Sequence, residues 1–134
     1  MEQIKYRSQF IAAGSLGLIA VVFGAFSAHG LEDRLDESSL RSFNTAVEYQ
    51  FYHVLAILIM CFAPEKLREN LVRLCINLFL TGIVLFCGSI YLLSTSGVVH
   101  NMEVGFLGPV TPIGGTVLIS AWFVLIVSAI PERK

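Results

Sequence analysis

Apolar stretches alternate with short polar segments along this 134-residue chain, and the apolar stretches are long. A helix that crosses a bilayer needs about 20 mainly apolar residues. Residues 10–28, 74–93 and 113–130 meet this requirement, and the first of them carries no charged residue at all. We therefore predict a membrane-spanning helix over each of these three segments.

A fourth apolar segment is less regular. Residues 51–63 are too few to cross a bilayer, so the span must begin at about residue 45, and the helix then contains Glu48, Gln50 and His53. Polar groups of this kind are expensive in lipid and have to be paired, hydrated or functional. We read residues 45–63 as the membrane half of a longer helix.

The first half of that helix is amphipathic. Leu40, Phe43, Val47 and Phe51 recur at spacings of three and four, which places them on one face of a helix. Asp36 or Ser38 would cap its start. We expect residues 38–47 to lie at the membrane interface before the chain enters lipid.

Turn residues suggest the remaining limits. Gly30 after His29 suggests a helix C-cap, and Pro64 can begin the short turn after the second span. Thr111 and Pro112 suggest the N-cap and first residue of the fourth helix. His100 falls in a polar loop and is expected to be solvated.

Composition supports a membrane class. Hydrophobic residues make up 55% of the chain and charged residues 14%, against roughly 25% charged in an average soluble domain. The net charge of −1 gives no basic surface for nucleic acid. The three cysteines have no CxxC spacing and are expected to be buried, unreactive thiols. We predict one all-α domain over residues 1–134, a four-helix transmembrane bundle.

Basic residues set the expected orientation. With the N-terminus in the cytoplasm, seven basic side chains lie inside and only Arg34 and Arg41 lie outside. This is a strong positive-inside bias. The seven are Lys5, Arg7, Lys66, Arg68, Arg73, Arg133 and Lys134. Both termini are therefore expected in the cytoplasm, and the loops around residues 30–44 and 95–112 are expected on the outer side.

The candidate chemistry gathers toward that outer side. The predicted depth brings polar groups from three segments to one end of the bundle, where they would line an outward-facing polar pocket. The candidate binding residues are His29, Glu48, Gln50, His53 and Thr111.

Structural alternatives remain open for each residue. His29 at a helix C-terminus can simply bond a free carbonyl. His53 can act as a hydrogen-bonding group between helices, and Glu48 can pair with His29 or Tyr52. At 100° per residue, Glu48 lies about 140° from His53 around an ideal helix, which argues against a tight metal site formed by the two.

Three blocks of residues resemble a known family. They are residues 24–31 (GAFSAHGL), 45–53 (TAVEYQFYH) and 108–115 (GPVTPIGG), with Trp122 beyond them. Together they resemble the bacterial inner-membrane family called domain of unknown function four-two-three, which is similar to a small eukaryotic transmembrane protein. The resemblance implies four transmembrane helices and no known activity.

We expect a multi-pass protein of the bacterial cytoplasmic membrane. Because the chain has no nucleophile–base pair, phosphate-binding loop or HExxH pattern, we expect no enzyme, cofactor or metal. The leading hypothesis is a non-enzymatic protein whose outer pocket holds a small ligand or a lipid headgroup. The alternatives are a transport or proton-coupled subunit and a structural, partner-binding module. The bilayer is the expected surrounding, and a homo-oligomer is compatible with four short helices.

Overall fold

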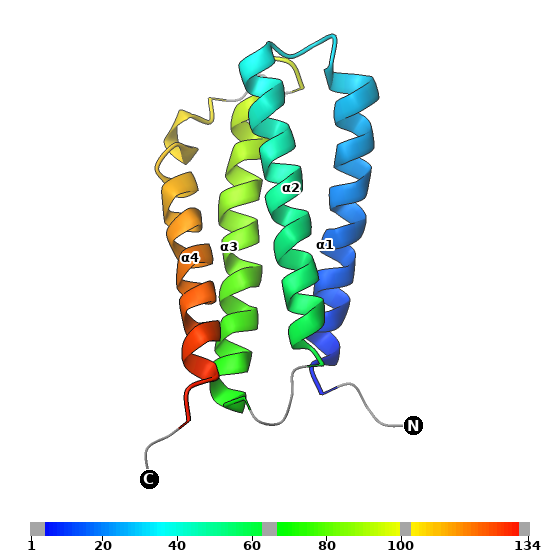
Figure 1. The fold of residues 1–134 in the computed structure, drawn as a ribbon. Helices are drawn as coiled ribbons and strands as arrows, with labels where there is room; N and C mark the ends of the chain where they lie inside the picture. Colours follow the sequence, from blue (N-terminus) through cyan, green and yellow to red (C-terminus); the bar gives the residue numbers. More distant parts are fainter. Residues whose placement is uncertain (1–4, 63–66, 100–102, 132–134) are drawn as a thin grey trace.

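The computed structural model describes residues 5–62, 67–99 and 103–131. Within these ranges the chain is helical and contains no strand. The helices are α1 (Arg7–Phe26), α2 (Glu37–Met60), α3 (Glu69–Thr95) and α4 (Val110–Ser128), with a π-helical turn at Ser27–Leu31 and a 3-10 turn at Gly105–Leu107 (Figure 1). The fold is a four-helix, all-α bundle, as the sequence predicts.

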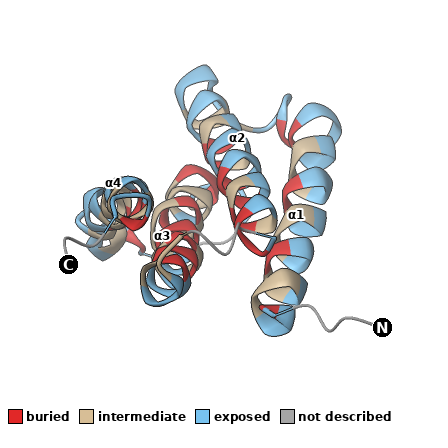
Figure 2. Cartoon of the chain, turned by 60° about the horizontal axis from the view of Figure 1, so that its bottom comes forward, coloured by how far each residue is buried: buried red, intermediate tan, exposed pale blue. Residues whose placement is uncertain are grey.

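The four helices pack in chain order. α2 packs against α1, α3 packs against α2, and α4 packs against α3, so α1 and α4 lie at opposite flanks (Figures 1 and 2). The end where α1 passes into α2 and α3 into α4 is called the loop end, and the opposite end is called the base. α1 begins and α4 ends at the base, where Ser128 accepts a backbone hydrogen bond from Arg68. The two flanking helices thus leave most of their surfaces to the lipid.

Three helical segments are long and apolar enough to cross a membrane: Arg7–Leu31, Glu69–Thr95 and Gly105–Ser128. α2 is long enough but too polar to qualify by composition. It nevertheless runs as one helix from Glu37 to Met60, so the expected amphipathic segment 38–47 and residues 45–60 of the expected span 45–63 belong to a single element. Its buried polar side chains point into the bundle, which reduces the cost of placing α2 in lipid.

Asp36 caps α2, as the sequence suggests: its carboxylate accepts the backbone N–H groups of Ser38 and Ser39 at 3.0 and 3.1 Å. The expected cap at Gly30 is wrong. The chain continues as the π-helical turn through Leu31, and no glycine among the described residues has a positive φ.

The expected start of the fourth helix at Thr111 is also wrong. α4 begins at Val110 with Pro109 before it, and the Thr111 side chain bonds Ser89 of α3 instead of capping its own helix. Five further expectations concern residues outside the described ranges, namely Pro64, Lys66, His100, Arg133 and Lys134.

Small residues bring α3 and α4 together. A Cβ added to Gly114 would lie 2.4 Å from the backbone nitrogen of Phe86, and one added to Gly82 would lie 2.5 Å from the side chain of Leu118. In lipid, helices associate through such close backbone approach because the solvent offers no hydrophobic driving force. The α3–α4 pair is therefore the most tightly packed part of the bundle.

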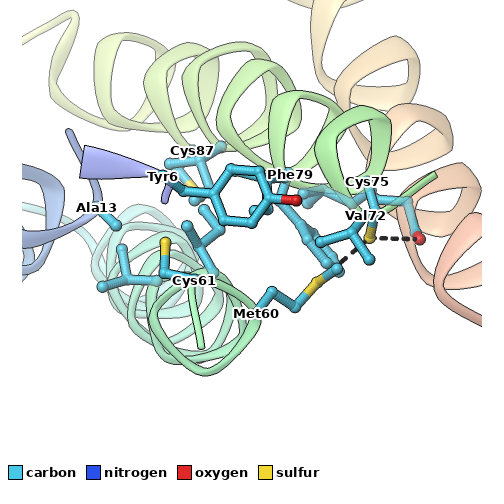
Figure 3. Packing of buried hydrophobic residues seen from close by; sticks show 14 of the residues in the cluster. Tyr6, Ala13, Met60, Cys61, Val72, Cys75, Phe79 and Cys87 are labelled. Atoms are coloured by element: carbon cyan, nitrogen blue, oxygen red, sulfur yellow. Dashed lines mark hydrogen bonds between the residues drawn. The ribbon is translucent and has the colours of Figure 1, made fainter. Parts of the chain in front are cut away.

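The core beside this pair is rich in sulfur (Figure 3). Cys75 is fully buried, and its thiol donates to the carbonyl oxygen of Ala121 at 3.1 Å and lies 3.5 Å from the sulfur of Met60. Cys61 and Cys87 are also buried and free. The prediction of buried thiols is confirmed.

Candidate functional site

Gln50 of α2 is buried and joins three helices. Its Nε2 donates to the carbonyl oxygen of Leu16 on α1 at 2.7 Å, and its Oε1 accepts from the hydroxyl of Tyr91 on α3 at 2.9 Å. Only 2% of the residue is exposed. Within lipid, a polar side chain placed in this way acts as an interhelical link.

His53, one turn further along α2, joins the fourth helix. Its Nδ1 lies 2.6 Å from the carbonyl oxygen of Tyr49, and its Nε2 lies 3.2 Å from the indole Nε1 of Trp122 on α4. Because a carbonyl only accepts and an indole N–H only donates, His53 is a neutral imidazole protonated on Nδ1. Both ring nitrogens are therefore used inside the protein.

Aromatic rings surround this link. Phe79 of α3 is completely buried, with its ring centroid 5.4 Å from that of His53 and 5.2 Å from that of Trp122. Gln50 and His53 thus connect α2 to every other helix, and the structure gives both residues the role of interhelical links.

Glu48 and His29 lie elsewhere, on exposed positions. Among the described residues, the Glu48 carboxylate has no hydrogen-bond or ion-pair partner, so the structure shows no bond from it to His29 or Tyr52. Glu48 borders a shallow groove of about 480 Å³ between α1 and α2. The other lining residues are Ala20, Val21, Gly24, Ala25, Val47, Phe51 and Tyr52.

Thr111 lies in a third place, at the loop end. It borders an open cavity of about 430 Å³ between α2, the last turns of α3 and the first turn of α4. Six of its eight lining side chains carry a hydroxyl, and we call it the hydroxyl pocket. The lining residues are Ser38, Ser39, Ser42, Thr45, Ile90, Leu93, Ser94 and Thr111.

The structure therefore does not bring the five candidate residues into one pocket. Residues 48, 50 and 53 of one helix point in different directions because each residue turns the side chain by 100°. Gln50 and His53 face the other helices, whereas Glu48 faces outward. Of the five, only Thr111 lines the hydroxyl pocket.

The sequence analysis missed the serine residues of this pocket. Ser38, Ser42 and Thr45 recur at spacings of four and three, so they share one face of the amphipathic half of α2. That polar face was the available signal. Serine alone is too common at helix starts to have identified a pocket without Ser94 from α3 beside it.

No group of three His, Cys, Asp or Glu side chains within the described ranges is placed to hold a metal ion. The lining of the hydroxyl pocket includes none of these residue types either. The chemistry of this pocket is hydrogen bonding by hydroxyl groups.

The apolar spans and the interhelical links define a small multi-pass α-helical membrane protein. The chain belongs to the family described as "Protein of unknown function (DUF423)", whose model matches residues 23–115. The matched segment contains all three blocks that carried the resemblance.

Relatives cover nearly the whole chain. It is 37% identical over 123 residues to the UPF0382 membrane protein YwdK of Bacillus subtilis, covering 90% of this chain and 95% of that protein. It is 39% identical over 110 residues to a UPF0382 membrane protein of Haemophilus influenzae, with coverage of 81% and 82%. It is 36% identical over 116 residues to the UPF0382 membrane protein C1782.12c of Schizosaccharomyces pombe, with coverage of 86% and 95%. No solved structure matches the chain.

Proposed function

We propose that this protein is a non-enzymatic binding protein of the bacterial cytoplasmic membrane, in which the hydroxyl pocket holds a small polar ligand or a lipid headgroup. The observation that carries the proposal is the pocket itself. Its volume of about 430 Å³ falls within the range of about 300–1,000 Å³ typical of small-molecule sites.

The composition of the lining supports binding rather than catalysis. Serine and threonine hydroxyls orient a ligand, but a hydroxyl becomes a useful nucleophile only beside a general base. The lining itself offers no such base, since Ile90 and Leu93 are its only members without a hydroxyl. The Asp36 carboxylate accepts from Ser39 and Ser38, but these hydrogen bonds hold its pKa well below the usual range and make it a poor base.

The proposed orientation places both ends of the chain in the cytoplasm, so that the hydroxyl pocket faces outward. The supporting observation is the charge bias of the sequence together with the arrangement of the helices. α1 begins and α4 ends at the base, which also carries the ion pair between Lys5 and Glu69 at 3.0 Å. Basic segments of this kind are retained in the cytoplasm.

The test is native mass spectrometry of protein extracted gently with its lipids, compared with the double variant Ser42→Leu/Ser94→Leu, which fills the pocket from both walls. The wild-type protein is expected to carry a bound small molecule or lipid that the double variant lacks. The same spectrum counts subunits and so tests for a homo-oligomer.

Ser15→Leu is the matched control. Ser15 lies on α1 outside the pocket, and its hydroxyl donates to the carbonyl of Ile11 four residues earlier, as Ser42 does to Ser38. The control should keep the bound molecule. If all three proteins carry the same adducts, or none, the proposal fails.

A further inference from the structure

The hydroxyl groups on the α2 wall of the pocket donate their protons within the protein. Ser38 Oγ and Ser39 Oγ donate to the two carboxylate oxygens of Asp36 at 2.8 and 2.7 Å. Ser42 Oγ donates to the backbone carbonyl of Ser38 at 2.9 Å. Each hydroxyl has one proton, and with that proton used inside the protein these three present their oxygen lone pairs to the cavity.

The same holds deeper in the pocket. Thr45 Oγ1 donates to the carbonyl of Arg41 at 3.0 Å. Across the cavity, Ser94 Oγ donates to the carbonyl of Ile90 at 2.7 Å. Both walls therefore present acceptors.

Thr111, the last of the six lining hydroxyls, donates its proton to Ser89. The Ser89 hydroxyl donates to the carbonyl of Phe86 at 3.0 Å, so in its 2.7 Å contact with Thr111 it must accept. Thr111 is then the donor, and its proton is also used. All six hydroxyls that line the pocket are acceptors toward its interior.

We infer that the ligand of the hydroxyl pocket carries a primary ammonium group, an inference that rests on the proposed function. An ammonium has three donors and no acceptor, which complements a lining of acceptor oxygens. The two possible sources are a soluble amine and the headgroup of an amine lipid, and they share this chemistry.

The net charge of the loop end agrees with a positively charged ligand. Residues 31–41 and 95–109 contain five carboxylates and two guanidinium groups, a net charge of −3. The carboxylates are Glu32, Asp33, Asp36, Glu37 and Glu103. The pocket lining itself is uncharged, and the net negative charge of these flanking segments attracts cations toward it.

An anion would fit less well, although two helices begin beside the pocket. The helix dipole places roughly half a positive elementary charge at the N-terminal end of a helix. At α2 the Asp36 carboxylate outweighs it and also occupies the N–H groups of Ser38 and Ser39. The start of α4 remains as a positive end, but α3 ends at Thr95 on the opposite wall with a dipole of opposite sign.

The experiment uses the full-length protein in nanodiscs of phosphatidylglycerol, titrated calorimetrically with ethanolamine, ethylene glycol and glycolate. These probes share size and differ in charge. Ethanolamine is expected to bind at least tenfold more tightly than ethylene glycol, and glycolate is expected to bind most weakly.

A second arm uses nanodiscs that contain phosphatidylethanolamine, with native mass spectrometry to detect retained lipid. Tight binding only of the lipid identifies a headgroup, and tight binding of ethanolamine identifies a soluble amine.

Asp36→Asn is the diagnostic variant, because asparagine caps helices as well as aspartate does but removes the charge. It should weaken ethanolamine binding severalfold and leave ethylene glycol unchanged. Neither aspartate lines the pocket, but Asp36 is hydrogen-bonded to two hydroxyls that do. Asp33→Asn removes the same charge from the adjacent loop and should therefore have the smaller effect.

The outcomes separate the two proposals. If ethylene glycol or glycolate binds as well as ethanolamine, and Ser42→Leu/Ser94→Leu abolishes that binding, the ammonium assignment is overturned while the binding function stands. If no probe binds and native mass spectra of wild type and double variant agree, both proposals are overturned.

Discussion

The indole N–H of Trp122 donates to Nε2 of His53 at 3.2 Å, and this is the hydrogen bond that joins α4 to α2 across α3 within the described residues. Tryptophan usually lies at the membrane interface, where its N–H meets water or headgroups. Trp122 lies in the middle of α4, where an indole N–H has to find a partner inside the protein. His53 can accept because its own proton is held on Nδ1 by the carbonyl of Tyr49.

A double-mutant cycle measures this link. Trp122→Phe removes the donor and keeps a ring against Phe79, whereas His53→Leu removes the acceptor. Each variant alone should lower the free energy of unfolding by about 1–3 kcal/mol, because a polar group of the bundle that lipid cannot satisfy loses its partner. The coupling energy between the two should lie between about 0.6 kcal/mol, the average measured for interhelical hydrogen bonds in lipid, and about 1.7 kcal/mol, the largest such value. Unfolding in mixed micelles gives all four values, and a coupling of zero would show that the contact contributes nothing.

Substitution of Gln50 should destabilise the protein more than substitution of His53, because Gln50 is hydrogen-bonded to two other helices. Gln50→Leu leaves the half-buried hydroxyl of Tyr91 without its acceptor inside the bundle. We expect a loss of about 2–4 kcal/mol in unfolding free energy, and about 1–3 kcal/mol for Tyr91→Phe, which removes one of the two bonds and leaves Gln50 Oε1 unpaired. Tyr52→Phe is the control, since Tyr52 is 57% exposed. Equal losses for Gln50→Leu and Tyr52→Phe would contradict the role of Gln50 as a link.

The sequence predicts the helices of this protein better than its site. Apolar runs of 18 or more residues leave few alternatives to a spanning helix, and the helical repeat correctly separates the direction of Glu48 from that of His53. The partners of Gln50 and His53 could not be predicted, because Leu16, Tyr91 and Trp122 approach them only through tertiary packing. A single sequence gives depth along each helix but not the rotation of one helix against another, so residues at one predicted depth looked like one pocket. Thr111 illustrates the same limit: its local pattern favours a cap, but the neighbouring Ser89 is a competing partner that only the fold supplies.

Gly114 tests the close approach of α3 and α4. Gly114→Ala places a Cβ 2.4 Å from the backbone nitrogen of Phe86, and backbone cannot move aside as a flexible side chain can. The two helices must separate, which should cost about 1–3 kcal/mol or more, as overpacking does elsewhere. Gly14→Ala is the matched control, because nothing lies within 4 Å of its added Cβ. In a helix this control substitution should be neutral or stabilising. Thermal unfolding that ranks the two variants in the opposite order would refute the packing geometry.

Asp36 should make the stability of the protein depend on pH. Hydrogen bonds from Ser39 and Ser38 hold the pKa of this exposed carboxyl well below its usual range. Because the folded pKa lies below the unfolded value of about 3.9, the contribution to stability is complete above that value and is lost as the pH falls through the folded pKa. The difference in melting temperature between wild type and Asp36→Ala should therefore be constant from pH 7 to about pH 5 and should shrink toward pH 2. A difference that grows on acidification would show that the carboxylate does not cap α2.

Cysteine labelling decides the orientation on which the outward-facing pocket depends. The three natural thiols are buried, so an introduced cysteine is the accessible one. Gly97→Cys places a thiol at the loop end just after α3, in open space where an added Cβ meets nothing within 4 Å. Asn70→Cys places one in the first turn of α3, at the base. A membrane-impermeant maleimide added to intact cells should label Gly97→Cys and should label Asn70→Cys only after the membrane is permeabilised, because basic segments stay in the cytoplasm. The reverse pattern would turn the hydroxyl pocket toward the cytoplasm, and its ligand would then have to come from inside the cell.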